Sequence, residues 1–418
     1  MARAVPRGVE SKIAAGSDFY ESHETMAHPP RTSSSLTESE IWPEFRRQMP
    51  ICRRWSYLDH AAVAPLSAPA AAAIRGWLDQ ATDAGDTAWP QWESRLEEIR
   101  ALVARLINAQ PTEITFTPNT TAGINLVAEG LPWLDGDNVV TVANEFPSNL
   151  YPWMNLSRQG VETRRVEMPE GVIDINRLLA ACDSRTRVVS VSWIGYATGY
   201  RIDVAEVCAA VHERGALMFL DAIQGLGVFP LDVVDTQVDF LAADGHKWML
   251  GPEGAGLAFI RHDLLNQLVP RSVGWNSVQG RYSFDEINLD LRNEAARYEG
   301  GSQNMVGFHG LGASLELFAR SGLTHRHSRL AQRVLEISNL ACERIQSAGG
   351  TIRFPRKEMH RSGIVTFELP GTDPSQLRTA CQKAHIAVSC RGGGVRISPH
   401  AYNNEEDIQR LITVLESV

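Results

Sequence analysis

The stretch 237 QVDFLAADGHKWMLGPEGAGLAFI 260 decides the fold of this chain. Residues 238–243 form a short and mostly apolar run, as in a strand that is buried on both faces of a parallel sheet. The run gives way to a glycine-rich turn, and Lys247 stands at the junction. An amine in this place has few directions open to it except a cavity, and partial burial lowers the pKa of a lysine so that it becomes a nucleophile. The stretch therefore predicts a reactive lysine at the end of a buried strand.

A second apolar stretch, 216 ALMFLDAIQGLG 227, ends its strand at Asp221, 26 positions before Lys247 (247 minus 221). In open parallel α/β sheets, ligands bind outside the carboxyl ends of the strands, so both side chains are expected at one site. Pyridoxal phosphate requires two protein groups of this kind, a lysine that forms a Schiff base with its aldehyde and a carboxylate beside its ring nitrogen. The two stretches thus predict pyridoxal 5'-phosphate as the cofactor and Lys247 as the catalytic residue.

Together, DAIQGLG and DFLAADGHKWMLGPEGAG resemble the class V aminotransferase superfamily, which includes cysteine desulfurases, selenocysteine lyase, kynureninase and isopenicillin N epimerase. The resemblance runs from about residue 57 to residue 407. It implies the type I fold of pyridoxal-phosphate enzymes, an α/β fold with a large domain around a mostly parallel, seven-stranded sheet and a smaller α+β domain. We place the large domain at residues 71–310 and assemble the small domain from residues 41–70 and 311–418.

The chain between residues 114 and 243 alternates between strand and helical patterns, which is typical of a mostly parallel sheet covered on both faces. The sequence predicts helices at 91–108 and 203–214, a strand at 187–199, and an antiparallel edge strand at 256–261. Helices over 311–348 then lead into the smaller region. We therefore expect the strand that ends at Asp221 and the strand that ends just before Lys247 to belong to one sheet.

The composition is that of an ordinary globular protein, with 44% hydrophobic and 21% charged residues. The formal net charge of −9 argues against a nucleic-acid partner. No apolar run is long enough for a membrane helix, and residues 1–35 lack the apolar segment of a signal peptide. Six scattered cysteines fit a reducing cytoplasm and offer no metal-site spacing. Residues 1–40 are polar, and we expect a disordered or loosely docked extension there.

The stretch 114 ITFTPNTTAGINLVAEGL 131 predicts a strand that turns into a helix near Thr120. Free amides and the dipole at a helix N-terminus attract anions, and the hydroxyls of Thr120 and Thr121 add donors. On their own, the two threonines could simply cap the helix. Because they lie upstream of Asp221 and Lys247 and are similar to the family's phosphate turn, we expect them to bind the cofactor phosphate.

Further cofactor contacts are implied by the resemblance. Phe146 stands where desulfurases carry a histidine that stacks on the ring; a phenyl group can stack but cannot relay a proton, and core packing is the alternative. Tyr196 replaces an asparagine that touches the ring hydroxyl, and Gln224 would be a second donor to that oxygen. His246 would face the phosphate or the ring. Asp244 replaces a phosphate-binding serine, and because its charge would repel phosphate, we assign it no such role.

The resemblance also implies a substrate site. Ala62, in 57 YLDHAAVAPLSAPA 70, belongs to backbone that lines this site. Arg396 would bind the α-carboxylate of an amino acid, since guanidinium and carboxylate pair through two parallel hydrogen bonds. Arg391 is a weaker candidate for the same role, and a surface salt bridge is the alternative for Arg396. His60 is interpreted as a turn residue bonded to the backbone.

The stretch 298 YEGGSQNMVGFHGLG 312 resembles a family segment whose hydroxyl residue crosses the dimer interface to the partner's phosphate. Here that residue is Ser302. The resemblance therefore implies a homodimer with shared active sites, and an ordinary glycine turn before a helix is the alternative.

These features predict an enzyme that binds an amino acid through a Schiff base on Lys247 and removes its α-proton. Phe146 and the short link between Cys390 and Arg396 favour an isopenicillin N epimerase-like reaction. Transamination and β- or γ-elimination stay open, as does a desulfurase or selenocysteine lyase reaction with Cys390 as nucleophile. A protein of the same fold that binds without turnover is the alternative of another class. The intact set of Asp221, Gln224, Lys247 and Arg396 argues against it.

Overall fold

The computed structural model describes residues 38–418, which lie within one compact unit. Most of the predicted N-terminal extension, residues 1–40, lies outside the described residues. Its last three residues instead open helix α1 (Glu38–Arg47). Ile41 and Phe45, one turn apart, are buried, so this helix packs on the core through one apolar face.

The central element is a seven-stranded sheet in the order β2-β8-β7-β6-β5-β3-β4. Its strands are β2 (Ile114–Thr117), β3 (Asn138–Val142), β4 (Glu162–Val166), β5 (Thr186–Ser192), β6 (Leu217–Asp221), β7 (Phe240–Asp244) and β8 (Gly256–Ile260). Strands β4, β3, β5, β6 and β7 pair in parallel, whereas β8 is antiparallel to both of its neighbours. The predicted mostly parallel sheet is confirmed. The edge placement of 256–261 was wrong, because β2 pairs with β8 from outside and forms the edge.

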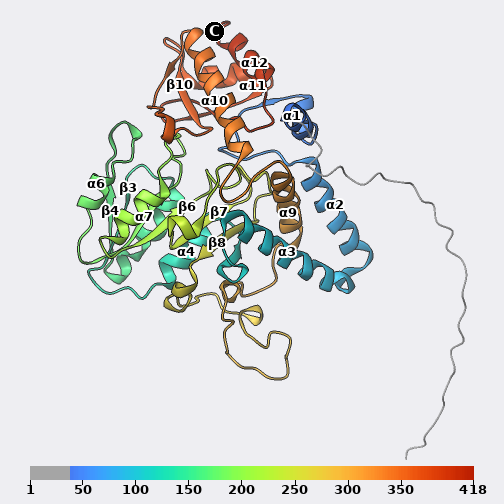
Figure 1. Cartoon of the computed structure of the whole chain (residues 1–418), viewed down its shortest axis with the longest axis vertical. Helices are drawn as coiled ribbons and strands as arrows, with labels where there is room; N and C mark the ends of the chain where they lie inside the picture. The colour runs from blue at the N-terminus through green and yellow to red at the C-terminus, as the bar shows by residue number, and fades with distance from the viewer. Residues whose placement is uncertain (1–37) are drawn as a thin grey trace, which may run out of the picture. The chain divides into compact units, whose positions relative to one another are not determined.

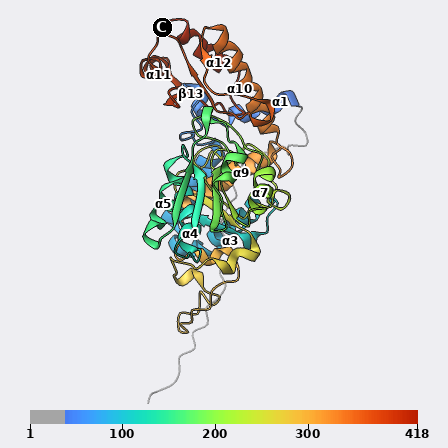
Figure 2. The ribbon, with the colours of Figure 1, turned by 90° about the vertical axis from the view of Figure 1, so that its left-hand side faces the viewer.

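Alternate residues of these strands are buried on opposite faces of the sheet, as the period of a strand requires. Val188 and Phe219 pack with helices α4 (Thr120–Gly130) and α5 (Tyr151–Asn155). Val189 and Leu220 belong to the core on the other face, which also includes residues of α3 (Trp89–Ile107), α7 (Val204–His212) and α9 (Met305–Arg320). In Figure 2, α5 is seen to the left of the strands and α7 to the right. The sheet is therefore covered on both faces.

The remaining helices are α2 (Ala68–Asp83), α6 (Ile175–Ala180), α8 (Val233–Thr236), α10 (Arg329–Ser347), α11 (Pro374–Lys383) and α12 (Glu405–Leu415). The predicted helices at 91–108 and 203–214 correspond to α3 and α7. Among residues 38–418, no helix has the length and hydropathy that a membrane span needs.

A second sheet forms near the C-terminus in the order β12-β13-β10-β9. Its strands are β9 (Thr351–Ile352), β10 (Val365–Glu368), β12 (Ser389–Arg391) and β13 (Gly394–Ile397), and β1 (Ser56–Tyr57) pairs separately with β11 (Ile386–Ala387). Figure 1 shows α10, α11, α12 and β10 gathered at one end, with α1 close by. The division at residues 70 and 310 remains a prediction.

The predicted strand 187–199 is shorter in the structure. Strand β5 ends at Ser192, and the chain turns back so that Ile194 bridges Arg201 in antiparallel fashion. Gly199 has a φ of +69°, a left-handed conformation that glycine adopts without strain. Tyr196 therefore lies in a loop above the sheet edge.

Candidate active site

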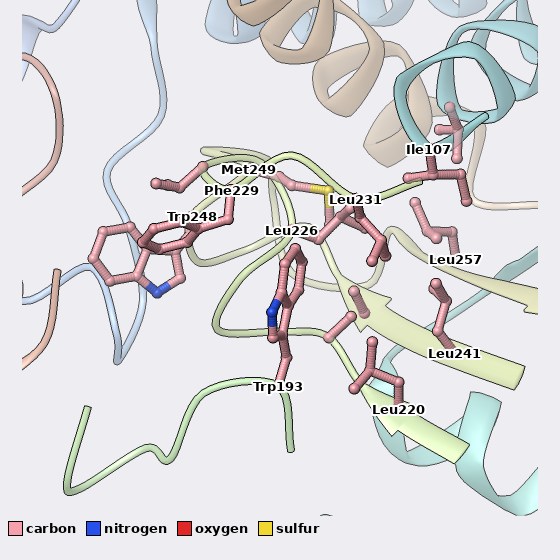
Figure 3. Close-up of a cluster of buried hydrophobic side chains, with 14 of the residues drawn as sticks. Ile107, Trp193, Leu220, Leu226, Phe229, Leu231, Leu241, Trp248, Met249 and Leu257 are labelled. Carbon is pink, nitrogen blue, oxygen red and sulfur yellow. The ribbon is translucent and has the colours of Figure 1, made fainter. Parts of the chain in front are cut away.

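Lys247 lies in the tight turn that follows strand β7. Gly245 permits this turn, because a Cβ there would come within 2.7 Å of the Ala255 carbonyl oxygen. Trp248 and Met249, which follow the lysine, are buried in a hydrophobic cluster (Figure 3). Two large apolar side chains thus anchor the turn on one side of Lys247, and the Lys247 side chain lines a cavity of about 290 Å³.

The Lys247 amine and the Asp221 carboxylate carry opposite charges beside this cavity. Burial lowers the pKa of Lys247 to about 8, and the charge of Asp221 opposes that shift. Burial likewise raises the pKa of Asp221 to about 6, and the backbone N–H of Ile223 donates to its Oδ1 at 3.1 Å. Within residues 38–418, no side chain or backbone group hydrogen-bonds to the Lys247 amine. The amine is therefore available to a ligand, which is what a nucleophile needs.

The cavity brings together most of the side chains that the sequence singled out. It is lined by Ala61, Ala62, Val63, Asn119, Thr120, Thr121, Phe146, Ser148, Tyr196, Asp221, Ile223, Gln224, Asp244, His246, Lys247, Arg391 and Arg396. Of the predicted site residues, only Ser302 lies elsewhere. It is exposed and lines a separate small cavity beside Trp275 and Gln303.

One end of the cavity is the N-terminus of helix α4. The side chain of Asn119 caps this helix by accepting from the Ala122 N–H at 2.9 Å. Thr120 Oγ1 accepts from the backbone N–H of Asp244 at 2.9 Å, and Thr121 donates to Ser148 at 2.8 Å. The Thr120 hydroxyl hydrogen stays available to an anion, and so does the positive end of the helix dipole.

Asn119 and Ser148 were not among the predicted site residues. A Pro-Asn-Thr run before an apolar periodic segment is a helix-start signal, so Asn119 could have been found from the sequence. Ser148 follows Phe146-Pro147 in a short turn whose contact with Thr121 depends on the tertiary structure.

Two aromatic side chains form the opposite wall. The rings of Phe146 and Tyr196 meet edge to face, with centroids 5.4 Å apart. The Lys247 amine lies 5.3 Å from the centroid of Phe146. Phe146 is 40% exposed, so core packing does not explain it. Its ring is positioned to stack on a flat ligand held next to the lysine.

Gln224 is already engaged in the protein. Its Nε2 donates to the Ala61 carbonyl oxygen at 3.1 Å, and its Oε1 accepts from Trp248 Nε1 at 2.8 Å. One N–H of the amide remains for a ligand. His60 is fully buried, with Nδ1 2.8 Å from the Ser398 carbonyl oxygen, in keeping with its interpretation as a backbone-bonded turn residue.

Arg396 enters the cavity from strand β13 and is almost fully buried. Its Nη2 pairs with Asp59 Oδ1 at 3.0 Å and its Nη1 donates to the Tyr196 carbonyl oxygen at 2.8 Å. Its Nε is buried without a hydrogen-bond partner among the described residues. The surface salt bridge is therefore not the explanation for this arginine, and Asp59 is a site residue that the sequence did not indicate.

Cys390 faces away from the cavity. It lies on strand β12, where side chains alternate between faces, and its neighbour Arg391 lines the cavity instead. The Cys390 thiol donates to the Pro374 carbonyl oxygen at 3.3 Å. The link to β13 is a tight turn through Gly392 and Gly393, both with positive φ. No cysteine is among the described residues that line the cavity.

These groups fit pyridoxal phosphate. Lys247 offers an unpaired amine for the aldehyde, Asp221 a buried carboxylate for the ring nitrogen, and Phe146 a flat apolar surface. The start of helix α4, with Thr120 and Thr121, offers donors for the phosphate. The fold and the cavity thus define a pyridoxal-phosphate-dependent enzyme of the type I fold.

The comparisons with known proteins agree with this class. The model of the family Aminotransferase class-V matches residues 56–411, and the chain belongs to this family. A probable cysteine desulfurase of Methanothermobacter thermautotrophicus is 34% identical over 397 residues, which cover 90% of this chain and 97% of the relative.

Solved structures show the same fold. The apo structure of a cysteine desulfurase from Thermococcus onnurineus superposes with a TM-score of 0.80 at 25% identity, covering 90% of this chain and 97% of the other. The cystine C-S lyase C-DES in complex with cysteine persulfide gives a TM-score of 0.82 at 23% identity, covering 88% and 99%. At that identity the second likeness speaks for the fold alone.

Proposed function

We propose that this enzyme releases sulfur from cysteine or a cysteine derivative by breaking the Cβ–S bond, without passing the sulfur to Cys390. The names of the relatives favour the desulfurase-type alternative over the isopenicillin N epimerase-like reaction. The observation that carries the proposal is a cavity in which Lys247, Asp221 and Arg396 converge but which no cysteine among the described residues lines.

Bound pyridoxal phosphate supplies an electron sink for the pair left behind when a bond to the α-carbon breaks. The residues of the chain do the rest. The buried carboxylate of Asp221 keeps a positive ring nitrogen in place. The amine of Lys247, whose pKa burial lowers to about 8, accepts the α-proton near neutral pH. Arg396 holds the substrate carboxylate so that the α-proton faces the lysine.

After α-proton removal, sulfur leaves from the β-carbon with the bonding electron pair and takes up a proton. The three-carbon remainder leaves as pyruvate and ammonia after addition of water, so the reaction is balanced without an external oxidant or reductant. A persulfide route would need the Cys390 thiol within reach of the substrate sulfur and would yield alanine instead. The Cys390 thiol instead donates to the Pro374 carbonyl oxygen, and neither residue lines the cavity, which favours elimination.

The test compares products from purified holoenzyme given L-cysteine or L-cystine. We expect a sulfur product (sulfide or persulfide) together with pyruvate and ammonia, unchanged in Cys390→Ser and in the matched thiol control Cys182→Ser, and abolished in Lys247→Ala. Alanine as the product, lost in Cys390→Ser, would instead establish a persulfide desulfurase. Exchange of the α-proton with solvent deuterium without sulfur release would point back to epimerisation.

We also propose that the chain acts as a homodimer in which Ser302 reaches the partner's cofactor phosphate. Two features support this. Ser302 is exposed and lies outside the Lys247 cavity of its own chain. The segment 282–289, between β8 and α9, carries four exposed apolar side chains within eight residues, and a second copy of the chain would cover them. They are Tyr282, Phe284, Ile287 and Leu289.

A further inference from the structure

The step that releases sulfur from the β-carbon needs a proton donor. An alkyl thiolate is a poor leaving group, so a general acid at the sulfur speeds its departure. Lys247 takes the α-proton at the start of the same reaction, and the phenyl group of Phe146 has no proton to give. No cysteine among residues 38–418 lines the cavity. The proposed elimination therefore calls for a separate proton donor in the cavity wall.

Tyr196 brings a phenolic hydroxyl to the wall of this cavity. Its ring meets the ring of Phe146 edge to face, and the Lys247 amine lies 5.3 Å from the centroid of Phe146. The carbonyl oxygen of Tyr196 accepts from Arg396 Nη1 at 2.8 Å. Tyr196 thus lies between the aromatic wall beside the lysine and the arginine that we expect to bind the substrate carboxylate.

The hydroxyl of Tyr196 is available to a substrate. Among the residues that the structure describes, none forms a hydrogen bond with this hydroxyl, and a phenol can donate one. Burial lowers the pKa of Arg396, whereas Asp59 and Tyr196 oppose that shift, so the hydroxyl lies within electrostatic reach of the guanidinium. The unused donor is therefore on the side of the cavity where the substrate is expected.

The loop that carries Tyr196 is anchored at two points. The Gly195 N–H donates to the Tyr200 carbonyl oxygen at 3.0 Å, which closes the loop on itself. Thr366 Oγ1, on strand β10 of the second sheet, donates to the Ala197 carbonyl oxygen at 2.6 Å. Because these contacts fix the backbone on both sides of Tyr196, its side chain needs little reorganisation to meet a substrate.

We propose that Tyr196 is the general acid that protonates the leaving sulfur, an inference that rests on the proposed Cβ–S cleavage. Lys247 removes the α-proton, and the electron pair of the Cα–H bond ends in a Cα–Cβ double bond. The electron pair of the Cβ–S bond leaves with the sulfur, which takes the phenolic proton. Solvent then returns a proton to the phenolate, so the step is balanced without an oxidant or a reductant.

Two substrates with different leaving groups separate this role from others. S-Ethyl-L-cysteine releases a basic alkyl thiolate, whereas β-chloro-L-alanine loses chloride, which takes up no proton. A general acid therefore matters for the first substrate and not for the second. A purely structural role of Tyr196, or a contact between Tyr196 and the cofactor ring, would affect both substrates alike.

The experiment measures release of pyruvate by the holoenzyme from each substrate. We expect Tyr196→Phe, which removes only the hydroxyl, to lower kcat for S-ethyl-L-cysteine by on the order of a hundredfold, with little change in KM. Turnover of β-chloro-L-alanine should stay at the wild-type rate. Exchange of the α-proton of L-alanine with solvent deuterium should also stay unchanged, since Lys247 performs that step. Tyr200→Phe, on the same loop but outside the cavity, is the matched control and should change none of these rates.

Equal losses for both substrates in Tyr196→Phe, or none for S-ethyl-L-cysteine, would overturn the proposal. Normal turnover of β-chloro-L-alanine by the variant also shows that its fold and cofactor site are intact. If the wild-type enzyme accepts L-cysteine but not S-ethyl-L-cysteine, L-cysteine takes its place in the comparison. A wild-type enzyme that forms pyruvate from neither sulfur substrate would overturn the proposed function itself, so the two failures are distinguishable.

Discussion

Asp59 and Arg396 form an ion pair in the wall of the active-site cavity, with Oδ1 and Nη2 3.0 Å apart. Asp59 Oδ1 also accepts from the Ser389 hydroxyl at 2.9 Å. Arg396, the expected carboxylate-binding residue, is therefore already oriented by Asp59 before any substrate binds. Its unpaired Nε remains buried at the site, so an incoming carboxylate meets a guanidinium whose direction is already set.

Asp59→Asn should raise KM for the amino acid by roughly tenfold, with a smaller change in kcat, because Arg396 would lose the partner that orients it. Steady-state kinetics with the identified substrate measure both constants. Asp59→Glu keeps the charge and should recover part of the loss. A fall in kcat at constant KM would contradict a role in substrate binding.

The pH dependence of cofactor capture should report the pKa of Lys247. Burial lowers this pKa to about 8, and only the neutral amine attacks an aldehyde. Neutral amine makes up roughly one tenth of Lys247 at pH 7 and roughly nine tenths at pH 9. The rate at which apoprotein captures pyridoxal phosphate should therefore rise with a midpoint near pH 8. A midpoint near that of a free lysine would show that the amine is not buried.

The same measurement on Asp221→Asn tests the link between the two charged groups. The Asp221 carboxylate raises the pKa of Lys247 against the effect of burial. Removing the charge should move the midpoint to lower pH, because the ammonium form loses its stabilising neighbour. An unchanged midpoint would mean that the two side chains do not interact, and a shift to higher pH would contradict a stabilising effect of the carboxylate on the ammonium form.

A buried ion pair should stabilise the large sheet. Arg100 Nη1 lies 2.6 Å from Glu299 Oε1, and that carboxylate also accepts from the Phe116 N–H on edge strand β2. Arg100→Met should lower the free energy of unfolding by about 3–5 kcal/mol, because Glu299 would be left buried and unpaired. Urea denaturation of the apoprotein measures the change.

Arg95→Met on the same helix is the matched control. Arg95 pairs with Glu98 and Glu316, and all three side chains are at least partly exposed to solvent. Its loss should cost less than about 1 kcal/mol, since solvent screens exposed pairs. Similar costs for Arg95→Met and Arg100→Met would refute the assignment of stability to the buried pair.

Mixed dimers can test the role of Ser302. Ser302→Asp should abolish activity, because a carboxylate would face the partner's phosphate. We expect chains that carry Lys247→Ala to be inactive because they lack the amine that reacts with the cofactor. If Ser302 serves the partner's site, mixing and refolding the two variants restores one intact site per mixed dimer, so activity returns. If Ser302 serves its own chain, the mixture stays inactive, and if it serves neither site, Ser302→Asp alone keeps its activity.

Much of the site could be read from local sequence. The ends of β6 and β7 were predictable because apolar runs mark buried strands, and their parallel pairing follows from alternation with helices. Asp221 and Lys247 then meet at one edge of the sheet, as expected. The edge position of β8 could not be read in this way, because β2 comes from a distant part of the chain and its own pattern does not say which strand it joins.

The sequence by itself determined the ends of β6 and β7, the helix start at Thr120 and the place of Lys247 in the turn after β7, because each depends on side-chain periodicity, capping and turns within a few residues. Only the tertiary structure decided how the predicted groups are paired. Asp59 lies 337 residues from Arg396, and the direction of the Cys390 thiol depends on which face of β12 meets the cavity. Such contacts are fixed by how folded layers pack against one another, and no local pattern encodes them.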